Sequence, residues 1–218
     1  MRRVVNEVRR VGMNRYSGAI LCILLLLLVV PTVNASITGW TCTDDGDGAI
    51  VMSPTGWTDN GGHDYTYSMN CAQYWYPGHL LGDFTTDTEL DPAVGIIEDI
   101  SNDTAFDWTD YHITIGMTKT FTFLNSGLMM PDGWTAQIIA PVAGILPNSN
   151  NVSGYVGTVN YYQSAGDPVA IGDDGLFGFK VSFTGSTSFT TQQIPTPEPA
   201  TIGLLGLGAM ALLRRRKA

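Results

Sequence analysis

The stretch Leu176-Phe177-Gly178-Phe179-Lys180-Val181-Ser182-Phe183 alternates between large apolar side chains and small or polar ones. Successive side chains of a β-strand point to opposite faces, so one face carries the apolar set and the other carries Gly178, Lys180 and Ser182. The stretch therefore predicts a strand with one buried face and one face toward solvent.

The same alternation recurs along much of the chain. It is seen over 65–71 and 108–117, and continuing the first register places Trp75 inside beside Cys71. Further strands are expected at 49–53, 94–100, 120–124, 135–140, 155–162 and 189–194, separated by turns rich in Gly, Asp, Asn and Pro. This spacing predicts an all-β fold, an antiparallel β-sandwich that is jelly-roll-like. A closed barrel is the alternative that alternation does not exclude.

The first 35 residues have the organisation of a secretory signal peptide. Five arginines within residues 2–15 precede an apolar run at 18–30, and Val33-Asn34-Ala35 offers small residues where a signal peptidase selects them. We expect a signal peptide at 1–35 with cleavage after Ala35. A retained N-terminal anchor is the alternative.

The C-terminal residues fall into three parts. Pro197-Glu198-Pro199 leads into a run of apolar or small residues at 200–213, which is followed by a basic tail at 214–218. The basic residues are Arg214, Arg215, Arg216 and Lys217. We expect an extended linker at 195–199 after a sandwich domain at 36–194, a transmembrane segment at 200–213 and a tail held on the cytoplasmic side. A helix rises about 1.5 Å per residue and the hydrocarbon core is about 30 Å thick, so this short span predicts a provisional anchor.

This three-part tail resembles the PEP-CTERM sorting signal of Gram-negative bacterial surface proteins. The Pro-Glu-Pro triplet, the apolar span and the basic tail match that signal in order and spacing. The resemblance implies recognition by a membrane peptidase of the exosortase type, a transient anchor in the inner membrane, removal of the tail and delivery to the cell surface or extracellular matrix. An ordinary C-terminal membrane anchor is the alternative.

The body of the chain is strongly acidic. Residues 36–195 contain 18 Asp and Glu but only two cations, Lys119 and Lys180, so their net charge is −16 against −9 for the whole chain. Nucleic acids and anionic membrane surfaces are bound through basic patches, so neither is expected as a partner of this body. Divalent cations and neutral glycans fit its charge.

Two cysteines, Cys42 and Cys71, lie within the body. An even number of cysteines in an exported chain favours a disulfide, which here would close a loop of about 30 residues. Two buried free thiols are the alternative.

One turn and one aromatic run are candidate binding sites. Asp44, Asp45 and Asp47 place three carboxylates in a Gly-rich turn of the kind calcium accepts, although the spacing is not that of an EF-hand and turns favour Asp for backbone reasons alone. No other cofactor is expected. Tyr74 and Tyr76 would share a solvent face if the preceding register continues, so that their rings could stack on sugars. Packing across strands is the alternative.

No catalytic motif is found in the sequence. The three histidines have no zinc-ligand spacing, and there is no phosphate loop or nucleophile elbow. A glycosidase pair involving Glu89 or Glu98 is not distinguished from the many aspartates. We therefore expect a non-enzymatic structural or adhesive protein of the extracellular polysaccharide layer. A carbohydrate-binding module is the first alternative and a secreted glycan hydrolase the second.

Overall fold

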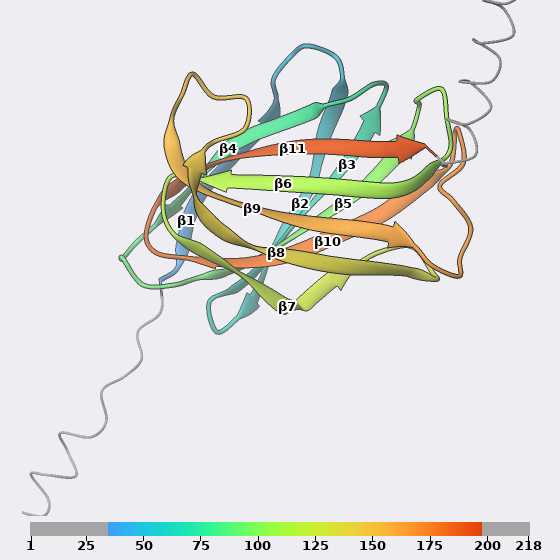
Figure 1. The fold of residues 1–218 in the computed structure, drawn as a ribbon. Helices are drawn as coiled ribbons and strands as arrows, with labels where there is room; N and C mark the ends of the chain where they lie inside the picture. Colours follow the sequence, from blue (N-terminus) through green and yellow to red (C-terminus); the bar gives the residue numbers. More distant parts are fainter. Residues whose placement is uncertain (1–34, 198–218) are drawn as a thin grey trace, which may run out of the picture. The chain divides into compact units, whose positions relative to one another are not determined.

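The computed structural model describes residues 35–197, which form two β-sheets (Figure 1). The six-stranded sheet has the order β1-β4-β11-β6-β9-β8, with bounds β1 Ile37–Asp44, β4 Gly78–Thr86, β11 Thr187–Pro197, β6 Trp108–Met117, β9 Ser153–Gln163 and β8 Trp134–Ile145. The five-stranded sheet has the order β2-β3-β5-β10-β7, with bounds β2 Ile50–Gly61, β3 Asp64–Gln73, β5 Ala93–Asn102, β10 Asp174–Phe183 and β7 Phe121–Met129.

Both predicted chain ends fall mainly outside these residues. The expected signal peptide, apart from Ala35, and the expected transmembrane segment and basic tail lie outside the described range. Within residues 35–197, no helix is long and apolar enough to cross a membrane.

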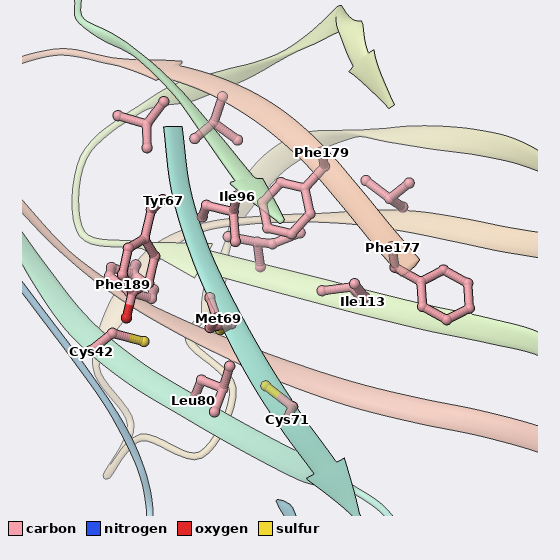
Figure 2. Close-up of a cluster of buried hydrophobic side chains, with 14 of the residues drawn as sticks. Cys42, Tyr67, Met69, Cys71, Leu80, Ile96, Ile113, Phe177, Phe179 and Phe189 are labelled. Carbon is pink, nitrogen blue, oxygen red and sulfur yellow. The ribbon is translucent and has the colours of Figure 1, made fainter. Parts of the chain in front are cut away.

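The sandwich prediction is confirmed, because the strands form two sheets that pack face to face rather than one closed barrel. β10 shows the reason. Phe177, Phe179, Val181 and Phe183 are all buried between the sheets, as their alternation predicts. Side chains from the facing sheet, among them Ile113 on β6, complete this layer (Figure 2).

Three features of the fold differ from the expectation. Strands β1 and β4 were not predicted, because glycine, threonine and aspartate interrupt their apolar pattern. One neighbouring pair, β3 and β5, is parallel, whereas the others are antiparallel.

The third difference concerns the expected linker. β11 continues to Pro197, three residues beyond the predicted strand end at Ile194, and it pairs with β6 along this stretch. Its ladder with β4 ends at Gln193, opposite Gly78. Proline has no N–H to donate, so Pro195 and Pro197 are tolerated where one side of the strand has no partner.

Candidate functional site

The candidate site lies where the loop after β1 meets the loop after β3. The backbone N–H groups of Tyr74 and Trp75 both donate to the carbonyl oxygen of Ala49, at 2.9 and 3.3 Å. The indole of Trp75 covers Gly48, whose φ of 81° suits glycine and where an added Cβ would lie 3.3 Å from the ring. These contacts hold the acidic turn and the aromatic run side by side.

The acidic turn gains a histidine from β4. One ligand atom each from Asp45, Asp47 and His79 lie within 4.8 Å of one another. Asp45 Oδ2 is 3.1 Å from His79 Nδ1 and also accepts a hydrogen bond of 2.7 Å from the Asn148 amide. Two carboxylates and one imidazole form a mixed oxygen and nitrogen donor set. Such a set suits a transition-metal dication better than calcium, which prefers oxygen ligands.

Asp44 has a different role from the one its sequence neighbours suggest. Its carboxylate accepts hydrogen bonds from the backbone N–H groups of Gly46, at 3.1 Å, and Met52, at 3.2 Å. It does not belong to the group formed by Asp45, Asp47 and His79. Asp44 therefore shapes the turn, which is the ordinary backbone role of aspartate in loops.

The aromatic run is exposed, but not as a continuation of β3. That strand ends at Gln73, and the prediction that Trp75 lies inside is wrong, since 52% of Trp75 is exposed. Tyr74 and Tyr76 are 46% and 50% exposed, as expected. Tyr76 contacts Phe106 edge-on, with ring centroids 5.8 Å apart. The two tyrosines thus flank an exposed indole rather than forming a platform on a strand face.

A network of buried polar side chains is hydrogen-bonded to the loop that carries Tyr74, Trp75 and Tyr76. Tyr111 Oη lies 3.0 Å from Gln73 Oε1 and 2.6 Å from Gln193 Oε1. Gln193 Nε2 donates to both carboxyl oxygens of Glu98, at 3.1 and 2.9 Å. Gln73 Nε2 in turn donates to the carbonyl oxygen of Trp75 at 3.1 Å. The network thereby links the aromatic loop to the strands beneath it.

Glu98 is the only carboxyl group in this network, and it is fully buried. Removal from water disfavours the charged form, so burial raises the pKa of Glu98 to about 8, while the hydrogen bonds from Gln193 act in the opposite direction. Glu98 is therefore mostly protonated at neutral pH.

The predicted disulfide is wrong, because Cys42 and Cys71 are both free, buried thiols. Cys42 lies on β1 and Cys71 on β3, which belong to opposite sheets, and their sulfur atoms are separate in Figure 2. Burial raises the pKa of Cys42 to about 12 and also raises the pKa of Cys71. Thiols that stay protonated are poor nucleophiles, so both act as small core side chains.

The sequence carries a signal for this network in the positions of three polar residues. Gln73 is in phase with the inward residues of β3, Glu98 with those of β5 and Gln193 with those of β11. A polar residue at an inward position must find a partner inside the core. Three such residues on separate strands indicate a buried hydrogen-bond network, although the strand order is needed to pair them.

The fold and its ends define an acidic β-sandwich whose last strand leads into a basic-tailed apolar segment. Comparison with protein families matches the PEP-CTERM protein-sorting motif to residues 195–217, so the chain carries this motif, as its tail predicts. The motif supports export and processing by an exosortase, which is a membrane protein. Searches of curated proteins and of solved structures gave no match.

Proposed function

We propose that the protein is a non-enzymatic structural or adhesive component of the extracellular polysaccharide layer. The observation that carries the proposal is a sorting motif joined to an acidic sandwich. The sandwich is the delivered product, and the motif directs it to the cell surface or matrix after transient anchoring in the inner membrane.

The two glutamates of residues 36–195 count against one alternative, a glycosidase pair formed by both of them. Glu98 is fully buried and bonded to Gln193, whereas Glu89 is exposed and lies 3.3 Å from the ammonium group of Lys119. A glycosidase needs two carboxyl groups on opposite sides of one scissile bond. These two glutamates do not present such a pair to a substrate.

The role in the matrix can be tested in cells. Cells lacking the protein should retain less polysaccharide at their surface, and the full chain should restore retention. A chain truncated after Pro197 should not restore it, because it lacks the rest of the sorting motif. Polysaccharide retention that is unchanged in cells lacking the protein would contradict the proposal.

The sorting step has its own measurement. Mass spectrometry of the exported protein should find a C-terminus at or near Pro197 to Pro199. Recovery of mature protein that still carries Arg214 to Lys217 would contradict removal of the tail.

A carbohydrate-binding module is the second candidate, and the exposure of Tyr74, Trp75 and Tyr76 favours it. Ring faces stack on the apolar faces of sugars, and here three exposed aromatic residues follow one another on a loop held by backbone hydrogen bonds. The exported protein should be retained by at least one polysaccharide in a panel. Replacing Tyr74 and Tyr76 by Ala should abolish retention, while Tyr162→Ala, a half-buried tyrosine on β9, should not. Absence of retention on every glycan would count against the module.

Cation binding at the acidic turn is also proposed, with Asp45, Asp47 and His79 as ligands and Asp44 shaping the loop. Thermal unfolding should be measured with added calcium and, separately, manganese. An increase in Tm that is lost in Asp47→Asn supports a site. Equal Tm values with and without both cations would contradict it.

A further inference from the structure

Strand β8 is one of the two edge strands of the six-stranded sheet, and β1 is the other. β8 pairs with β9 on one side and ends the strand order on the other (Figure 1). An edge strand has unpaired backbone N–H and C=O groups along its open side, which can accept another strand. Proteins commonly protect such edges with lysine, other charges or proline.

β8 has little of this protection. Its 12 residues, Trp134 to Ile145, include no charged side chain. Ile139, Val142 and Ile145 are 51%, 65% and 53% exposed. The single protective residue is Pro141, at the bulge where the pairing register with β9 shifts between Ile139 and Val142. This strand is therefore apolar, exposed and interrupted once.

The charge distribution indicates which partner β8 can accept. Of the 18 acidic residues between positions 36 and 195, one, Asp132, lies within residues 120–166. This segment, residues 120–166, has a net charge of −1 and includes β7, β8 and β9. Two copies that met through a surface outside residues 120–166 would bring more carboxylates together than two copies that meet through β8, where Asp132 and Asp167 lie beside Trp134 at one end of the strand.

We propose that β8 is a homodimer interface, in which it pairs antiparallel with β8 of a second copy. A contact made by the same strand on both copies follows a twofold axis and closes at two molecules. The bulge at Pro141 restricts the backbone ladder to a short segment such as residues 134–140, and the exposed aliphatic side chains beyond it add apolar contact. This pairing does not depend on the proposed role in the polysaccharide layer.

The oligomeric state of the exported protein, recovered from producing cells, tests the interface. Sedimentation velocity should show a monomer–dimer equilibrium that shifts toward dimer as salt increases, because salt screens the repulsion between two acidic bodies. Ile139→Lys and Val142→Lys should each weaken the dimer by about a hundredfold, since every dimer contains the substitution twice and a charged group replaces apolar contact.

Val51→Lys is the matched control. Val51 is 47% exposed on β2, one of the two edge strands of the other sheet, so the substitution adds the same charge at similar exposure. It should leave the dimer intact, and circular dichroism should show that all three variants are folded. A protein that stays monomeric up to about 1 mM, or a dimer that is equally sensitive to Val51→Lys, would overturn the proposal.

Discussion

The two ends of the core are formed by the same alternating strands, but they differ in the side chains that point inward. At the end near the β4–β5 connection, Phe84 stacks on Phe183 and Phe189, with ring centroids 5.2 and 5.0 Å apart. At the end where β11 terminates, inward positions carry Gln73, Glu98, Tyr111 and Gln193 instead. We call these the apolar end and the polar end.

The comparison shows that two equally buried parts of a core can differ in how their stability depends on pH and on single hydrogen bonds. Apolar side chains need only complementary shape, so the apolar end should be insensitive to pH. Amide, hydroxyl and carboxyl groups must satisfy one another inside the protein. The polar end should therefore respond both to proton concentration and to the loss of single hydrogen bonds.

The largest effect is expected at the apolar end. Phe84→Ala removes a 2% exposed ring from between two others and should lower the free energy of unfolding by about 3–5 kcal/mol, because the cavity refills only in part. Urea unfolding at pH 5 and pH 8 should give the same loss. Leu90→Ala, at a 44% exposed position, is the control and should change little. If the free energy of unfolding lost in Phe84→Ala depends strongly on pH, the proposed difference between the apolar end and the polar end is wrong.

An effect of comparable total size, but dependent on pH, is expected from Glu98 at the polar end. Its pKa rises from 4.5 to about 8 on folding, so between these values the folded state holds a proton that the unfolded state has lost. The contribution of Glu98 to stability is therefore fully present below about pH 4.5 and declines by roughly 1.4 kcal/mol per pH unit until the pH passes its folded pKa.

Glu98→Gln isolates this contribution, because the amide has a similar shape and does not titrate. The stability difference, wild type minus variant, should fall steadily between pH 5 and pH 8 and become level above that range. Chemical unfolding at several pH values measures it. Parallel pH profiles for the two proteins would show that Glu98 does not titrate as its burial predicts.

The smallest of these effects is expected for Tyr111→Phe. This change removes one hydroxyl group and leaves Gln73 Oε1 and Gln193 Oε1 without the donor they share, at a cost of about 1–3 kcal/mol. The ring stays in contact with Phe177, whose centroid lies 4.5 Å away, so packing is kept. The cost should be measured by urea unfolding. If Tyr111→Phe leaves the free energy of unfolding unchanged, another buried group donates to Gln73 Oε1 and Gln193 Oε1.

Alternation predicted the apolar end well, and the reason is local. In β10 and β6 the alternation alone shows which residues point inward. Phe177 and Ile113 can therefore be predicted as buried without knowledge of any neighbouring strand. β4 was missed because glycine and aspartate at Gly82 and Asp83 interrupt its apolar residues. Its burial depends on β1 and β11 beside it, which a single stretch of sequence does not reveal.

The candidate site was predicted only in part, because its members come from separate loops. Asp45 and Asp47 were identified from their own turn, but His79 joins them from β4. Trp75 was placed inside by extending the β3 register past Gln73, where the strand in fact ends. The disulfide was inferred from a count of cysteines, and a count does not show that the two sulfur atoms lie apart in the core.

The continuation of β11 to Pro197 has a mechanical consequence. β11 is hydrogen-bonded to β4 on one side and to β6 on the other, and the sorting motif begins within its last residues. While the tail is attached, a pull on the tail reaches the domain through this strand, and we consider a pull directed along its length. Because ladder hydrogen bonds lie perpendicular to the strand, such a pull loads them together in shear instead of opening them one at a time. The sandwich is thus joined to the sorting motif by a strand that is paired on both sides up to Gln193 and with β6 alone from there to Pro197.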